Sequence, residues 1–112
     1  MDHGHLVDAT PDTFDALVAS HPGLVVAYFW GPDCPNCEIF ARDLPALMAS
    51  APPSVRWLKV DAYLHTALAA RFGLFGVPAF VLFKGGRKLG MMREYRGRDF
   101  FGQVVAEQAE AA

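Results

Sequence analysis

Two cysteines, Cys34 and Cys37, carry the most reactive side chains of this sequence. They lie where a continuous apolar run, residues 24–30, has ended and a segment with helical periodicity begins. Unpaired N–H groups at a helix start stabilise a thiolate by about 0.3–1 kcal/mol, and by up to ~2 kcal/mol when the sulfur is partly buried. Cys37, one helical turn later, can close a disulfide with Cys34 or release a mixed disulfide formed there. The spacing therefore predicts thiol–disulfide exchange.

Five segments are predicted to be the strands of the scaffold. Residues 24–30 are continuously apolar and rich in β-branched and aromatic side chains, which is typical of a strand buried on both faces. Gly85-Gly86 is a hairpin signal between the last two strands. The predicted strands cover residues 5–9, 24–30, 55–60, 79–83 and 89–95.

Four helices are predicted around these strands. The first begins at Thr10-Pro11, the second begins at about Pro35 and is kinked by Pro45, and the third ends near Gly73. The last covers residues 99–109 and is weakened by Gly102. The side chains expected to face the core are Phe14, Leu17 and Val18; Ile39, Phe40, Leu44, Leu47 and Met48; Leu64, Leu68 and Phe72; and Phe101, Val104 and Val105.

This order of elements, βαβαβαββα, predicts an α/β fold with helices on both faces of a mixed central sheet. Alternating strands and helices imply parallel pairing with right-handed crossovers, and the glycine hairpin adds an antiparallel strand. A chain of 112 residues with 53% hydrophobic side chains fits one globular domain, residues 1–112, which needs no disulfide for its stability.

Composition also limits where the protein acts. The longest apolar runs have about 5–7 residues, against the ~20 that a membrane span requires. The first residues lack the basic and apolar regions of a secretory signal, so a cytoplasmic protein without membrane contact is expected.

Basic residues crowd one short region of a chain whose net charge is −2. We interpret this strip as a charged, solvated edge hairpin, because it lacks the interleaved aromatic residues and the overall positive charge of a nucleic-acid binder. No nucleic-acid partner is expected. The strip consists of Lys84, Arg87, Lys88, Arg93, Arg96 and Arg98, opposed by Glu94.

From about residue 8 to 108, the sequence resembles the thioredoxin family. A Cys-x-x-Cys pair at a strand-to-helix junction, about forty residues before a Val-Pro that opens a strand, is a specific combination. The segments that carry the resemblance are Val26-Ala27-Tyr28-Phe29-Trp30, Cys34-Pro35-Asn36-Cys37, Lys59-Val60-Asp61, Gly73-Leu74-Phe75-Gly76-Val77-Pro78 and Phe83-Lys84-Gly85-Gly86.

The resemblance implies a thioredoxin fold and a role for each site residue. Cys34 is then the exposed nucleophile and Cys37 the buried resolving thiol. Pro78 matches the family's cis-proline, and the backbone of Val77 would pair with an extended substrate. The substrate-binding set implied in this way is Trp30, Asp33, Pro35, Phe75, Val77 and Pro78.

The resemblance also implies partners. Protein thiols and disulfides are the expected substrates, and thioredoxin reductase or glutathione is the expected electron donor. We expect a monomer with no bound cofactor and no metal.

Five positions depart from the family pattern. Asp33 stands where thioredoxins usually have Trp, and Pro35-Asn36 replaces Gly-Pro between the cysteines. Tyr28 replaces the buried Asp that accepts the proton of the resolving thiol, and Trp57 stands in place of its companion Lys. A tyrosine with a reference pKa near 10 is a poor base at neutral pH. Slower turnover, or proton transfer through water, follows from this replacement.

Several readings of the cysteine pair stay open at this point. Reduction of protein disulfides comes first, and disulfide oxidation or isomerisation second, because proline after the first cysteine resembles oxidases and glutaredoxins. A binding module that holds a partner beside Phe75, Val77 and Pro78 is the alternative outside enzymology. Zinc binding with His3 and His5, or a purely structural disulfide, is less well supported.

Overall fold

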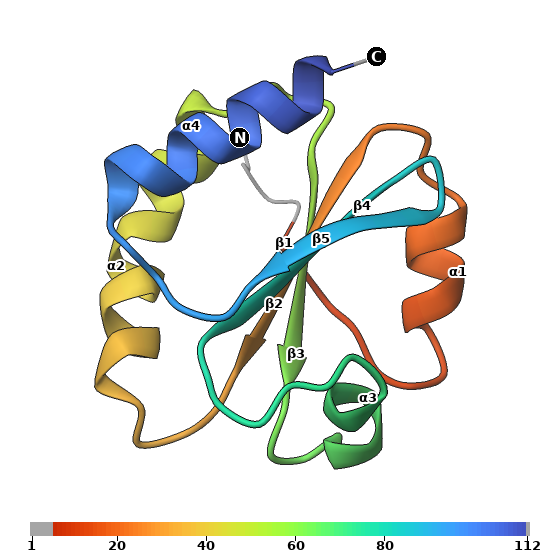
Figure 1. The fold of residues 1–112 in the computed structure, drawn as a ribbon, viewed down its shortest axis with the longest axis vertical. Coiled ribbons are helices and arrows are strands. Elements are labelled where there is room, and N and C mark those ends of the chain that lie inside the picture. The colour runs from red at the N-terminus through yellow and green to blue at the C-terminus, as the bar shows by residue number, and fades with distance from the viewer. Residues whose placement is uncertain (1–5, 112) are drawn as a thin grey trace.

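The computed structural model describes residues 6–111. Figure 1 shows a five-stranded sheet with helices on both of its faces, as predicted. The elements are β1 (Leu6–Asp8), α1 (Phe14–Ala19), β2 (Leu24–Trp30), α2 (Pro35–Ser50), β3 (Arg56–Asp61), α3 (Thr66–Arg71), β4 (Ala79–Lys84), β5 (Arg87–Met92) and α4 (Arg98–Glu110).

The strand order in the sheet is β1-β3-β2-β4-β5, which places β2 at the centre. β1 and β2 both run parallel to β3. β4 runs antiparallel to β2, and β5 antiparallel to β4. The prediction of a mixed sheet is therefore confirmed, but β4 was expected to be parallel. After α3 the chain enters β4 in the direction opposite to β2. The hydrophobic pattern of β4 is the same for either direction, so the sequence did not reveal it.

Alternation along β2 divides the core into two clusters. Val25, Ala27 and Phe29 pack with Phe14 of α1 and Leu68 of α3 on one face. The even-numbered residues, Leu24, Val26 and Tyr28, pack on the other face with side chains of α2 and α4, mainly Phe40, Leu44, Leu47, Phe101 and Val105. Figure 1 shows α1 and α3 on one side of the sheet and α2 and α4 on the other. Successive β2 side chains point to opposite faces, so each cluster receives alternate residues.

The second cluster is dominated by aromatic rings. Phe40 and Phe80 have ring centroids 4.8 Å apart, and Phe101 lies 5.1 Å from Phe40 and 4.7 Å from Phe80. Trp57 stacks on Phe101 with the ring centroids 6.4 Å apart. These packed rings hold α2, and with it the cysteine pair, against the sheet.

Two helix starts differ from the prediction. α1 begins at Phe14, because residues 11–13 form a turn in which the Thr13 hydroxyl accepts a hydrogen bond from the Thr10 N–H at 2.9 Å. α3 begins at Thr66, which leaves Leu64 outside the helix and 71% exposed. Asp61 Oδ1 accepts the N–H groups of Tyr63 and Leu64, both at 3.0 Å, and this Asx turn delays the helix.

Other predicted details of the elements compare as follows. α2 continues through Pro45, and Ile39, expected in the core, is 43% exposed. The first strand begins at Leu6, while His5 lies outside the described residues. The hairpin glycines are confirmed: Gly85 and Gly86 have φ of 61° and 80°, a conformation that favours glycine.

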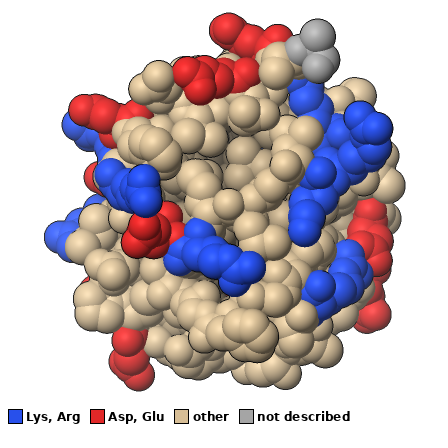
Figure 2. All heavy atoms as spheres, in the orientation of Figure 1, with Lys and Arg blue, Asp and Glu red and all other residues tan. Residues whose placement is uncertain are grey.

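The basic strip is used partly within the fold. Lys84 donates hydrogen bonds to the carbonyls of Gln108 and Ala109 at the end of α4, where a cation is favoured by the helix dipole. Arg93 donates to the carbonyl of Gly73 at 2.9 Å, and Arg96 pairs with Glu94. Figure 2 shows Lys and Arg side chains in separate groups on this face, with Asp and Glu groups beside them.

Among the helices of residues 6–111, none combines the length and the apolar composition needed to cross a membrane.

Candidate active site

The cysteine pair lies at the start of α2, as predicted. Cys34 is the N-cap residue and Pro35 the first helical residue, a position where proline loses no hydrogen bond. Cys34 and Cys37 form a disulfide with their Cα atoms 5.2 Å apart. The N–H of Cys37 donates to Cys34 Sγ at 3.1 Å. This N–H, together with the positive end of the 16-residue helix, would stabilise a thiolate on Cys34 after reduction.

The two cysteine residues differ in exposure less than expected. Cys34 is 9% exposed and Cys37 is 4% exposed, so Cys34 is the more accessible residue but is largely covered. Part of that cover comes from the loop before β4. The peptide bond between Val77 and Pro78 is cis, and Cys34 Sγ lies 3.5 Å from the carbonyl oxygen of Val77. Segments about forty residues apart in the sequence thus meet at the disulfide.

An exposed apolar surface adjoins the Val77 side of the disulfide. Phe75 is 92% exposed, and Tyr63, on the loop before α3, is 61% exposed. Both line a shallow cavity of about 400 Å³ that also includes Val77. The Tyr63 ring lies against Gly31, where an added Cβ would come within 2.8 Å of the ring. Phe75 and Val77 were predicted from the sequence, whereas Tyr63 was not; the one available signal for it was Gly31, the glycine against which its ring packs.

Trp30 and Asp33 lie on the other side of the cysteines, and Pro35 is the first residue of α2. Asp33 and Pro35 are exposed, and Trp30 is half-buried. Asp33 has a φ of 54°, a left-handed conformation that asparagine and aspartate adopt more readily than most residues. Trp30 and Asp33 line a second cavity with Cys37, whereas Phe75 and Val77 line the first. The predicted substrate-binding residues are therefore divided between the two sides of the disulfide.

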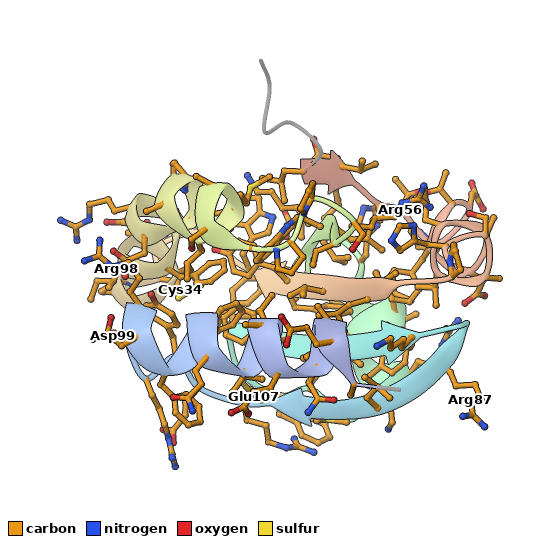
Figure 3. All side chains as sticks on the ribbon, turned by 90° about the horizontal axis from the view of Figure 1, so that it is seen from above. Cys34, Arg56, Arg87, Arg98, Asp99 and Glu107 are labelled. Atoms are coloured by element: carbon orange, nitrogen blue, oxygen red, sulfur yellow. A yellow bond between two sulfur atoms is a disulfide. The ribbon has the colours of Figure 1, made fainter. Side chains whose placement is uncertain are left out.

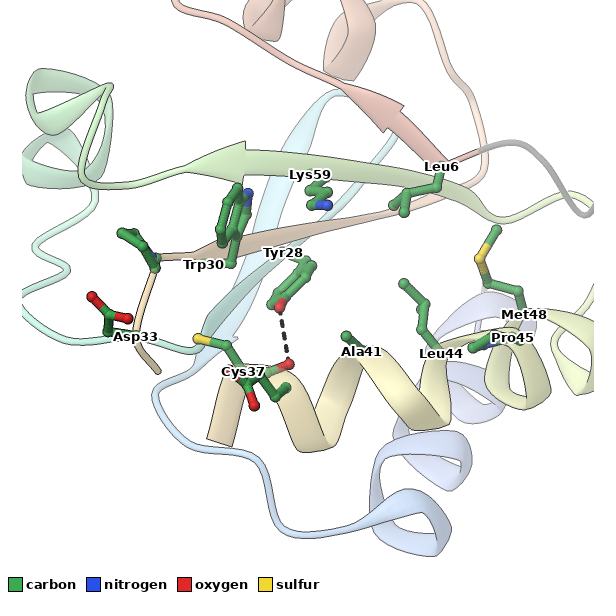
Figure 4. A pocket seen from close by; sticks show the side chains of 13 residues that line it. Leu6, Tyr28, Trp30, Asp33, Cys37, Ala41, Leu44, Pro45, Met48 and Lys59 are labelled. Carbon is green, nitrogen blue, oxygen red and sulfur yellow. Dashed lines mark hydrogen bonds between the residues drawn. The ribbon is translucent and has the colours of Figure 1, made fainter. Parts of the chain in front are cut away.

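Tyr28 lies beneath Cys37 in the second cavity. Its hydroxyl donates a hydrogen bond to the carbonyl oxygen of Cys37 at 3.3 Å (Figure 4). Burial raises the pKa of Tyr28 to about 12, so the hydroxyl stays protonated at neutral pH. Tyr28 therefore holds the first turn of α2 and does not act as a base for Cys37.

The second cavity is lined by a lysine, Lys59, that was not predicted to lie there. It has a volume of about 680 Å³ and lies between α2 and the strands β2 and β3 (Figure 4). Lys59 lines it and is the register partner of Tyr28, while Trp57 pairs with Val26 and is buried among aromatic rings. Trp57 thus belongs to the core. The lysine beside Tyr28 is Lys59, which was named from the sequence only within the segment Lys59-Val60-Asp61.

Within residues 6–111, no group of three or more His, Cys, Asp or Glu side chains is arranged to hold a metal ion. The zinc alternative that uses His3 and His5 lies outside the described residues.

The basic hairpin is distant from this site. In Figure 3, Cys34 lies toward one end of the molecule and Arg87, the first residue of β5, toward the other. The hairpin end of the strip thus lies away from the disulfide, whereas Arg98 lies toward the same end of the molecule as Cys34 in Figure 3. Arg93 donates to the carbonyl of Gly73, on the loop that leads to Phe75 and Val77.

Comparison with known proteins places this geometry in context. Residues 5–107 match the protein-family model described as Thioredoxin. Thioredoxin of Bacillus subtilis is 28% identical over 89% of this chain and 94% of that protein. Protein disulfide isomerase-like 2-1 of Oryza sativa is 33% identical over 76% of this chain, and the matched segment spans 24% of the rice protein.

A solved structure gives the corresponding match in three dimensions. A mutant thioredoxin from Halobacterium salinarum NRC-1 superimposes with a TM-score of 0.85, covering 96% of this chain and 94% of that one. Its sequence is 21% identical, so this likeness concerns the fold.

Proposed function

The chain belongs to the thioredoxin family, and from this premise we propose that it is a thiol–disulfide oxidoreductase that reduces protein disulfides through Cys34 and Cys37. The observation that carries the proposal is the position of the Cys34–Cys37 disulfide, at the start of α2 and beside the cis Val77–Pro78 bond. A disulfide that closes so short a loop adds little stability, which favours a chemical role over a structural one.

The reaction begins with the reduced pair. The Cys34 thiolate attacks one sulfur of a client disulfide, forms a mixed disulfide and displaces the other client sulfur as a thiolate. Cys37 then loses its proton and attacks Cys34 Sγ. This step releases the second client thiolate and leaves the Cys34–Cys37 disulfide, so two electrons pass from the pair to the client.

Recognition of the client is assigned to the Val77 side. An extended client segment would pair with the backbone of Val77 and place an apolar side chain against Phe75 and Tyr63. Trp30, Asp33 and Pro35 would border the client on the opposite side. Removal of the Cys37 proton falls to water in the second cavity, because Tyr28 is a hydrogen-bond donor to the Cys37 carbonyl.

Reduction of insulin disulfides by dithiothreitol tests this proposal. Catalytic amounts of the protein should accelerate the reaction, and Cys34→Ser should abolish the acceleration. A Cys34→Ser protein that reduces insulin at the wild-type rate would overturn the enzymatic account and favour a binding module.

Disulfide oxidation or isomerisation is the second candidate function. It is favoured by the similarity to the rice protein, whose name describes it as disulfide isomerase-like. Refolding of scrambled ribonuclease separates the candidates: a reductant accelerates insulin reduction, whereas an isomerase restores ribonuclease activity in a glutathione buffer. The reductant function requires faster turnover in insulin reduction than in the refolding of scrambled ribonuclease.

Partners and compartment follow from the reductant function. Thioredoxin reductase or glutathione would return the pair to the dithiol state, and a reducing compartment such as the cytoplasm would maintain it. We propose a monomer as the working form, since the disulfide must be open to a large client.

A further inference from the structure

We propose that the cavity beside Cys37 binds a small carboxylic acid with an apolar body, and that Lys59 holds its carboxylate. The volume of about 680 Å³ is within the range of small-molecule pockets, about 300–1,000 Å³. Apolar side chains form most of its wall: Leu6, Trp30, Leu44 and Met48. Such a wall favours an aliphatic or aromatic ligand rather than a polar one.

Lys59 gives this cavity its specificity for an anion. Its side chain is half-buried, and within residues 6–111 its ammonium group has no carboxylate within 4.0 Å. The Lys59 ammonium instead lies over the Trp30 ring, 4.9 Å from the ring centroid. A partly desolvated cation without a counter-ion attracts an anionic group more strongly than an exposed lysine does.

The distribution of charge also orients the ligand. Figure 4 shows Asp33 toward the cysteine end of the cavity, Lys59 on the strand wall, and Leu6 and Met48 toward the far end. Asp33 and Glu38 would repel a carboxylate at the cysteine end. The carboxylate is therefore placed at Lys59, and the apolar body extends over Leu44 toward Met48.

Occupancy of the cavity has a consequence for the cysteine pair. Cys37 lines the same cavity, and water there is the route by which its proton would leave. A bound apolar acid displaces that water and should slow release of the mixed disulfide. This consequence rests on the proposed function, whereas binding itself does not.

Decanoate is a suitable probe, titrated calorimetrically into the oxidised protein. We expect binding with a Kd below about 1 mM, and at least tenfold weaker binding of the neutral isostere decanamide. Nuclear magnetic resonance gives an internal control, because the chain has two tryptophans. Decanoate should shift the indole N–H signal of Trp30, in the cavity, and leave that of Trp57, in the core, unchanged.

Three variants test the assignment to Lys59. Lys59→Met should weaken decanoate binding about tenfold. Lys59→Arg should restore it, and Lys88→Met, which removes an exposed lysine of β5, should have no effect.

A matched pair of substitutions on α2 tests the cavity. Ala41→Phe places a ring in the cavity from an exposed position and should abolish binding, while Ala46→Phe, exposed on α2 but not in the cavity wall, should bind as wild type. Equal binding of decanoate and decanamide, wild-type affinity in Lys59→Met, or no saturable binding would overturn the proposal. Because these measurements use the oxidised protein, they are independent of whether it reduces disulfides.

Discussion

The two sides of the disulfide differ in exposure and in chemistry. On the Cys34 side, the carbonyl of Val77 lies 3.5 Å from the sulfur, and Phe75 is 92% exposed beside it. On the Cys37 side, a cavity contains the buried Tyr28 and the half-buried Lys59. One side presents backbone and apolar area that a protein client can use. The other side holds Cys37, the thiol that loses its proton in the second step of the proposed reaction.

This difference separates two requirements of thiol–disulfide exchange. Attack on a client requires an accessible thiolate and a surface that holds the client, whereas release requires a second thiol that the client does not reach. In the proposed function, Cys34 and the segment before the cis-proline meet the first requirement, and the packing of α2 on the sheet meets the second. Substitutions on the two sides should therefore affect different steps.

The two cysteines themselves should give the largest contrast. Cys34→Ser should lower the rate of insulin reduction at least about a thousandfold, because it removes the attacking sulfur. Cys37→Ser should still attack but should accumulate as a mixed disulfide with the client, detectable by mass spectrometry. Accumulation of the adduct in Cys34→Ser instead would reverse the assignment of the two roles.

Phe75→Ser tests the client side. It should raise the KM for insulin about tenfold, in line with the loss of one apolar contact, and leave kcat unchanged. The rate with a small aromatic disulfide should stay at the wild-type value. Leu64→Ser is the matched control, because Leu64 is 71% exposed but does not line the cavity beside Val77. Equal effects of the two substitutions would contradict a specific role for Phe75.

Tyr28→Phe tests the buried side through stability. The pKa of Tyr28 is about 12 in the folded protein and near 10 in the unfolded chain, so its contribution is present below pH 10 and is lost as the pH rises toward 12. Between pH 9 and 11 the wild type should lose about 1 kcal/mol more unfolding free energy than Tyr28→Phe. Denaturant unfolding at several pH values measures this difference. The pKa of Tyr95 is also raised, by burial and by Asp43, but Tyr95 is present in both proteins and so does not contribute to the difference between them. If the unfolding free energies of the two proteins fall in parallel with pH, the burial of Tyr28 is contradicted.

Tyr28→Asp should produce the smallest of these effects. A carboxylate beneath Cys37 supplies a base and should accelerate insulin reduction about threefold, since proton removal limits only one of the two steps. Tyr28→Asn is the control that removes the ring without adding a base. If Asp and Asn variants react at the same rate, the missing acid does not limit turnover.

Much of this arrangement could be predicted from the sequence. β2 has the predicted bounds, since a continuously apolar, β-branched segment has few alternatives, and the position of Cys34 at the start of α2 follows from Gly31-Pro32-Asp33. The thioredoxin fold and the family are confirmed. The cis bond at Pro78 came from the resemblance, because nothing local to Val77-Pro78 distinguishes cis from trans.

The contents of the cavity could not be predicted in the same way. Trp57 and Lys59 are two residues apart, so both point to the same face of β3, and only the register with β2 places Lys59 opposite Tyr28. Leu64 was placed in the third helix by its spacing with Leu68 and Phe72, but the Asx turn at Asp61 leaves it, together with Tyr63, on the exposed loop before α3. The position of Lys59 thus depends on pairing between distant segments, whereas that of Leu64 depends on a local turn that the helical spacing does not reveal.

The most direct test of the central claim is the equilibrium reduction potential of the Cys34–Cys37 pair. Free thiols are trapped with an alkylating agent across a series of glutathione redox buffers, and the products are weighed. A protein-disulfide reductant should give a value near or below about −250 mV, as thioredoxin-type pairs do. A value above about −200 mV would contradict the reductant function and indicate an oxidase or isomerase.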